Sequence, residues 1–171
     1  MHKLDHQDDV YPKKVLTFLD RIGIDVIERP IEHATFLPGL DLGPSCIYVD
    51  YARLDYPGDI LHEAGHLAVT PSAQRAIVGS EQQDKDWPPQ GEEIAAILWS
   101  YAAAIELDLP LNFIFHEHGY KDDSAWLIDN FVSGNYIGLP IMEWAGLSLG
   151  PQRAAKEGKP AFPAMLRWLR E

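Results

Sequence analysis

The stretch Asp59-Ile60-Leu61-His62-Glu63-Ala64-Gly65-His66-Leu67-Ala68-Val69 decides how this chain is organised. Pro57-Gly58 interrupts the chain just before it, and Asp59 is a residue type that favours the N-cap of a helix. Thr70-Pro71 follows directly, and the residue before a proline is disfavoured in helical conformation. These signals predict a helix from about Ile60 to Val69.

Within this predicted helix, His62, Glu63 and His66 form an H-E-x-x-H pattern. Residues four apart lie one above the other on a helix, so both imidazoles can bind one ion at the zinc–nitrogen distance of about 2.0–2.1 Å. Glu63 is rotated by about 100° from His62 and therefore flanks the ion. There it can take a proton from a zinc-bound water, whose pKa is lowered to about 7. The pattern predicts Zn²⁺ held by the two histidines, with Glu63 as general base.

A catalytic zinc usually has three protein ligands and one open position, so a third ligand must come from elsewhere. Glu92 and Glu93 open the next predicted helix, Gly91 to Leu107, which Pro110 follows. An antiparallel neighbour could bring either carboxylate to the ion, and both remain candidates on the residues alone. Small residues on this helix would let the predicted helix from Ile60 to Val69 approach closely: Ala95, Ala96, Ser100, Ala102, Ala103 and Ala104.

The two motifs together resemble the zincin metallopeptidases of the gluzincin type, and most closely the ImmA/IrrE-like families. The second family motif reads E-x-x-A-N-x-F-A, and the stretch Glu93 to Ser100, EIAAILWS, is similar to it, with Trp99 in place of Phe and Ser100 in place of the last Ala. It departs from the motif at Ile97, where Asn or Asp is common. The resemblance covers Ile47 to about Leu107 and implies a zinc metallopeptidase that cleaves a peptide or protein substrate. It makes Glu93 the preferred third ligand, while Glu92, which also begins an E-x-x-A pattern, stays as the alternative.

The flanking segments predict an α+β fold. Pro12 to Ile22 has helical spacing of apolar residues, whereas Ile24 to Glu28 and Cys46 to Asp50 are short and rich in β-branched or aromatic residues. The resemblance implies a zincin-like arrangement, with a small mixed sheet packed on the H-E-x-x-H helix and a second long ligand-bearing helix. It also implies that Cys46 to Asp50 is an edge strand to which a peptide can add.

The remaining segments carry weaker signals. The stretch from Thr70 to Gly91 is polar and rich in turn residues, with Ala76 to Val78 as a possible short strand. Beyond it we expect a strand over Leu111 to Phe115, a helix over Ser124 to Val132 and a short amphipathic helix over Ala161 to Arg170.

Composition limits the partners and the compartment. The 171 residues suit one domain, 1–171, and their formal charge of -12 disfavours nucleic acid and anionic membranes. Cys46 is the only cysteine, which fits a reducing, cytoplasmic location. Met1 to Asp9 lacks the pattern of a secretory signal, and the longest apolar stretch, Ile94 to Ile105, is too short to cross a membrane.

A second group of possible ligands, His116-Glu117-His118, follows the predicted Leu111 to Phe115 strand. In an extended segment the two histidines share one face, so they could bind metal or stabilise an oxyanion; a polar strand end or a turn is the simpler interpretation. They also bear on a competing hypothesis, a non-catalytic zincin domain that uses the metal structurally or binds proteins. A structural zinc normally has four protein ligands, and His116 or His118 could be the fourth.

Overall fold

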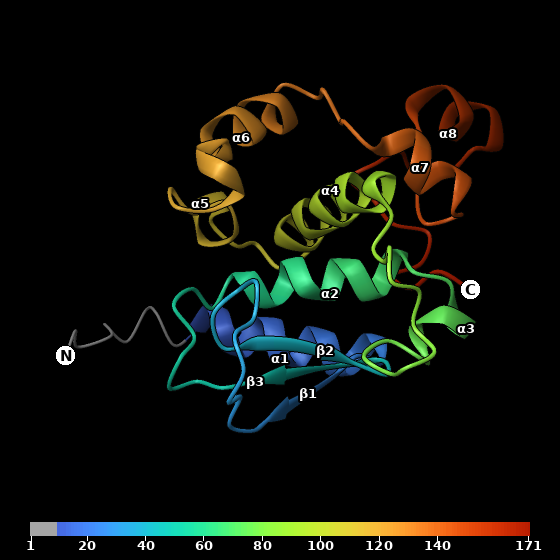
Figure 1. Cartoon of the computed structure of the whole chain (residues 1–171). Helices are drawn as coiled ribbons and strands as arrows, with labels where there is room; N and C mark the ends of the chain where they lie inside the picture. Colours follow the sequence, from blue (N-terminus) through green and yellow to red (C-terminus); the bar gives the residue numbers. More distant parts are fainter. Residues whose placement is uncertain (1–9) are drawn as a thin grey trace.

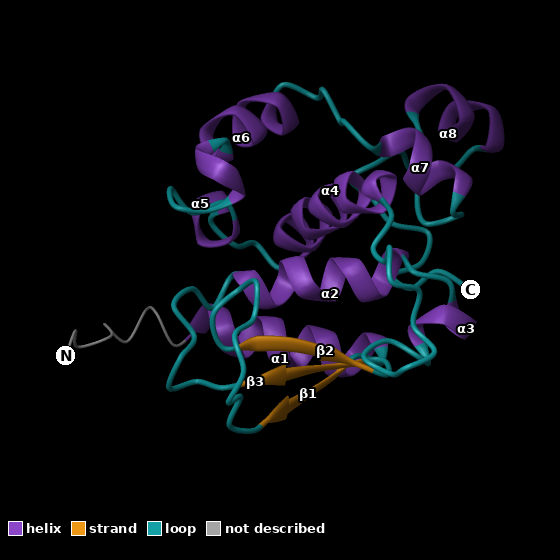
Figure 2. Ribbon diagram, viewed as in Figure 1, coloured by secondary structure: helices purple, strands orange, loops and turns teal. Residues whose placement is uncertain are grey.

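A computed structural model describes residues 10–171, so Met1–Asp9, where we expect no export signal, lies outside the described part. Helices and a small sheet make up the described chain, which confirms the α+β class (Figures 1 and 2). The elements are α1 (Val10–Ile22), β1 (Asp25–Glu28), β2 (Leu40–Gly43), β3 (Cys46–Val49), α2 (Asp59–Val69), α3 (Ser72–Arg75), α4 (Gln90–Glu106), α5 (Leu111–Ile114), a short turn of helix (Tyr120–Asp122), α6 (Ser124–Val132), α7 (Leu139–Trp144) and α8 (Pro151–Glu157).

The sheet is mixed, with strand order β1-β3-β2. β3 runs parallel to β1 and antiparallel to β2, to which the Pro44-Ser45 turn joins it. The prediction that Cys46 to Asp50 forms an edge strand is therefore wrong. β3 is buried in the middle of the sheet because Leu40–Gly43, for which the sequence analysis expected no strand, pairs along its second side.

The layers place α2 between the sheet and α4 (Figure 1). α1 and α2 pack on the sheet, and α4 packs on α2 more extensively than any other pair of elements. Val15, Phe18 and Leu19 of α1 recur at helical spacing and are buried in the same core as Trp99 of α4. Between residues 10 and 171, no helix has both the length and the apolar character that a membrane span requires.

Two predicted strands are helical or turned instead. Leu111–Ile114 is a single helical turn, α5, in which Ile114 is fully buried against the start of α2. Ala76 to Val78 is a turn that follows the short helix α3, which the sequence analysis did not predict. Both segments contain β-branched or aromatic residues, but their backbone N–H groups bond three or four residues back along the chain.

The predicted helix over Ala161 to Arg170 is also wrong. This segment is extended and turned, and Met165 forms an isolated bridge with Ser148. Its backbone N–H groups bond to distant segments: Phe162 donates to Leu149 O and Arg170 donates to Ala68 O. The apolar spacing that suggested a helix reflects burial against several different elements.

Candidate metal centre

The helix α2 positions three side chains of the candidate site, His62, Glu63 and His66. It begins at Asp59 and ends at Val69; the next residue, Thr70, is extended ahead of Pro71, as the sequence predicted. Asp59 is the first helical residue and does not act as the predicted side-chain N-cap. Both histidines are buried on the side of α2 that faces α4.

Close packing of α2 on α4 brings Glu93 to these histidines. A Cβ atom at Gly65 would lie 2.6 Å from the carbonyl oxygen of Ala96, so only glycine permits this approach. Glu93 precedes Ala96 by three residues and therefore lies on the same face of α4. The small residues of both helices thus set the distance between the two histidines and the carboxylate.

The candidate ligand atoms of His62, His66 and Glu93 converge. The two Nε2 atoms are 3.1 Å apart. The Glu93 carboxylate lies 3.4 Å from Nε2 of His62 and 3.0 Å from Nε2 of His66. Two ligands of a tetrahedral zinc at about 2.0–2.1 Å are separated by about 3.3–3.4 Å, so the spacing and the donor chemistry fit this ion.

Within residues 10–171, these are the only three His, Cys, Asp or Glu side chains whose ligand atoms group in this way. Glu92, the alternative ligand, faces away and forms an ion pair of 3.1 Å with Arg170. The structure therefore brings together His62, His66 and Glu93 and separates Glu92 from them.

Burial changes the acidity of the groups at this centre. It lowers the pKa of His62 to about 4, and the neighbouring His66 acts in the same direction. Burial also disfavours the charged form of His66, yet its hydrogen bond to Glu93 and the nearby carboxylates leave its pKa raised. A neutral imidazole at His62 is the form that can bind a metal ion.

Glu63 lines the cleft beside the three candidate ligands. Burial raises the pKa of Glu63 to about 7. The neighbouring His66 acts to lower this pKa, whereas the charges of Glu93 and Asp59 act to raise it. A carboxyl group with a pKa near neutrality can both accept and return a proton at neutral pH.

The cleft has a volume of about 1010 Å³ and is lined largely by apolar side chains. Leu42 of the edge strand β2 and the preceding loop, with Phe36 fully exposed, form one wall. Trp126 and Leu127 of α6 form another. A cavity of this size, with polar groups gathered near one point, is typical of ligand sites.

The second predicted ligand group is split. His116 donates from Nε2 to the buried Asp59 carboxylate at 2.9 Å and stacks on Tyr56, whereas His118 is exposed beside Glu117. The two histidines do not share one face of a strand, because their segment is a turn, which is one of the two simpler interpretations of the sequence. His116 and His118 thus remain outside the candidate ligand group.

Sequence reasoning missed two contributors to the site. Tyr120 lies against His62, with its hydroxyl 3.4 Å from Nδ1. Arg170, near the end of the chain, holds Glu92. No local pattern singles out either residue, because both reach the site through long-range packing.

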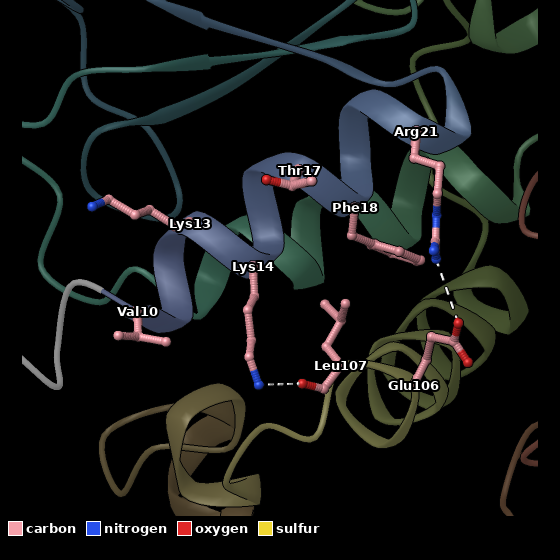
Figure 3. Close-up of a pocket in the computed structure, with 8 residues that line it drawn as sticks. All are labelled: Val10, Lys13, Lys14, Thr17, Phe18, Arg21, Glu106 and Leu107. Atoms are coloured by element: carbon pink, nitrogen blue, oxygen red, sulfur yellow. Dashed lines mark hydrogen bonds and ion pairs between the residues drawn. The ribbon is translucent and has the colours of Figure 1, made fainter.

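A smaller hollow of about 490 Å³ lies between α1 and the end of α4 (Figure 3). Lys14 donates to the carbonyl oxygen of Leu107 there, at 2.9 Å, and Arg21 pairs with Glu106. These contacts join the two helices, and the hollow contains no group of metal-ligating side chains.

Comparisons with protein-family models, with curated proteins and with solved structures found no match to this chain.

Proposed function

We propose that this protein is a zinc-dependent metallopeptidase of the zincin type, a hydrolase related to the ImmA/IrrE-like families. The observation that carries the proposal is the convergence of His62, His66 and Glu93 at donor spacings that fit zinc, without a fourth protein ligand from residues 10–171. Three ligands and a free position are typical of a catalytic zinc, whereas a structural zinc normally has four. The arrangement therefore favours catalysis over the competing structural hypothesis.

In this proposal His62, His66 and Glu93 hold the ion through two imidazole nitrogens and a carboxylate. When bound, zinc would supply Lewis-acid chemistry, lowering the pKa of water and polarising the carbonyl of the scissile peptide bond. Glu63 takes the proton from the attacking water and returns it to the leaving amine, which its pKa of about 7 permits at neutral pH.

The cleft supports a polypeptide as the substrate. Its apolar walls can bind side chains on both sides of a scissile bond, and the edge strand β2 contributes Leu42 to one wall. β2, rather than the β3 segment suggested by the sequence, is the sheet edge beside the cleft.

The test is the substitution Glu63→Gln, which preserves size and removes the general base. We expect the variant to retain one zinc per chain and to lose peptide hydrolysis by about 10²–10⁴-fold. Cleavage of a mixed peptide library, followed by mass spectrometry, measures activity, and elemental analysis measures zinc.

Glu117→Gln is the matched control because Glu117 is exposed and lies outside the candidate ligand group. It should cleave like the unmodified protein. Full activity in Glu63→Gln would remove Glu63 from the mechanism. Zinc-loaded protein that cleaves no peptide of the library would favour the non-catalytic alternative.

A further inference from the structure

The residues that line the cleft are divided by polarity. Its ionisable side chains come from the segment 55–66, from Glu93 and from the turn 116–123. The lining residues of α4 beyond Glu93, of α6 and of the segment after α6 are all apolar or aromatic. They form what we call the α4–α6 pocket: Ile94, Ile97, Trp126, Leu127, Phe131 and Ile137. The cleft thus has an apolar part beside the candidate metal centre.

Ile97 joins this pocket to the candidate metal centre. It follows Glu93 by four residues, so the two side chains share one face of α4 and lie about 6 Å apart along the helix axis. An extended peptide advances by about 3.4 Å per residue. A substrate whose scissile bond lies at the metal therefore brings a residue within two positions of that bond to Ile97. At Ile97 the chain also departs from the motif that it otherwise resembles, in which this position is commonly polar.

The helix α6 and the segment after it close the pocket. One turn beyond Ile97 along α4, Tyr101 packs its ring on Phe131 of α6, with the ring centroids 5.1 Å apart. Leu127 precedes Phe131 by four residues, so both lie on one face of α6, and both are buried. The segment after α6 returns to α4, because a Cβ atom at Gly138 would lie only 2.8 Å from the Ile94 side chain. α6 itself lies apart from α4 (Figure 1), and side chains of both helices line the cleft.

Large apolar side chains of the pocket remain in contact with water. Trp126 is 54% exposed and Ile94 is 38% exposed, beside the buried Leu127 and Phe131. Apolar surface of this kind, gathered in a cleft with polar groups near one point, is typical of ligand-binding grooves. An apolar ligand group that covers these side chains removes their surface and its own from water, which favours binding.

We propose that the α4–α6 pocket binds a leucine or phenylalanine side chain of the polypeptide substrate, within two residues of the scissile bond, and that Ile97 determines this specificity. The inference rests on the proposed peptidase function and adds a substrate preference to it. An alanine at this substrate position leaves the apolar walls partly uncovered. A charged or polar side chain there loses its hydrogen bonds to water without gaining partners from the walls.

The first test uses cleavage of a mixed peptide library, in which mass spectrometry identifies the residues around each cleaved bond. Leucine and phenylalanine should be enriched at one position within two residues of that bond. Ile97→Asn should lower kcat/KM for these peptides by at least about tenfold relative to peptides with alanine at the same position. Ile97→Phe, which fills the pocket, should instead shift the preference toward alanine.

Ile105→Asn is the matched control, because Ile105 belongs to the same helix, is 46% exposed and lies outside the cleft lining. It should cleave the library with the profile of the unmodified protein. The inference is overturned if leucine and phenylalanine are not enriched near the cleaved bonds. It is also overturned if both Ile97 variants keep the unmodified profile, whereas a merely structural role of Ile97 would slow the cleavage of all peptides equally.

The second test measures binding without cleavage, in the Glu63→Gln variant with ¹³C-labelled isoleucine methyl groups assigned by isoleucine-to-valine substitutions. Millimolar acetyl-alanyl-phenylalanyl-alanine amide should shift the NMR signals of Ile94 and Ile97 and leave that of Ile105 unchanged. The peptide with alanine in place of phenylalanine should shift none of them. If the unmodified protein cleaves no library peptide, the proposed function fails, and this measurement decides the pocket independently. Unmoved signals of Ile94 and Ile97 would overturn the inference.

Discussion

At the scale of single residues, the candidate site depends on two adjacent glutamates with different surroundings. A rotation of about 100° per residue along α4 directs Glu93 toward the histidines of α2 and Glu92 toward Arg170. The sequence alone left this choice open, since each of the two residues precedes an alanine by three positions and so begins an E-x-x-A pattern. The packing of α4 on α2 decides it.

This difference predicts opposite behaviour for two similar variants. Glu93→Gln should weaken zinc binding by at least about tenfold, because a neutral amide is a poorer ligand than a carboxylate. Glu92→Gln should bind zinc normally and lower the free energy of unfolding by about 1–3 kcal/mol through loss of the Arg170 ion pair. Zinc competition assays and urea unfolding measure the two effects. Normal zinc affinity in Glu93→Gln would exclude it as a ligand.

At the scale of elements, the contact of α2 with α4 sets the geometry of the site. The candidate ligands come from these two helices alone, and Gly65 lies against Ala96 at their contact. Any side chain at position 65 must push the helices apart.

Gly65→Ala should therefore lower the free energy of unfolding by about 1–3 kcal/mol, the usual cost of an extra methyl group in a packed interior. It should also weaken zinc binding. Gly91→Ala is the matched control, because its added Cβ would meet only a side-chain atom of Ile141 at 3.4 Å, and alanine favours a helix. Thermal and urea unfolding measure both variants. If Gly65→Ala left the free energy of unfolding unchanged, α2 and α4 would be able to move apart without a loss of stability.

The elements that the sequence predicted correctly are those with local signals. Helical spacing, proline stops and the H-E-x-x-H pattern located α1, α2, α4 and α6 to within about two residues. The strand β2 was missed although Leu40 to Gly43 alternates and ends at Gly43-Pro44, because four residues give little periodicity. The C-terminal segment was misassigned because its burial comes from distant partners. For the same reason, the sequence analysis did not identify Tyr120 and Arg170 as contributors to the site.

At the scale of the whole molecule, the C-terminal segment ties the end of α2 to the core. Arg170 donates to the carbonyl oxygens of Ala68 and Val69, which lack partners within the helix. Two residues earlier, Trp168 packs edge to face on Phe18 and accepts a hydrogen bond from the Trp99 indole at its carbonyl oxygen. The last residues of the chain thus support the helix that carries both histidines.

Trp168→Ala should lower the free energy of unfolding by about 3 kcal/mol, because it removes a large aromatic contact with the core. Trp144→Ala is the control: its side chain is exposed and contacts the Arg170 guanidinium, so the loss should stay below about 1 kcal/mol. Urea unfolding followed by circular dichroism measures both. Equal stability of the two variants would contradict this role of the C-terminal segment.

The most direct test of the metal site is the zinc content of untagged protein purified without chelator, measured by elemental analysis beside a His66→Ala variant. We predict close to one zinc per chain in the unmodified protein and close to none in His66→Ala. A folded, unmodified protein that contains no zinc and takes up none when it is added would contradict the site and the proposed peptidase function.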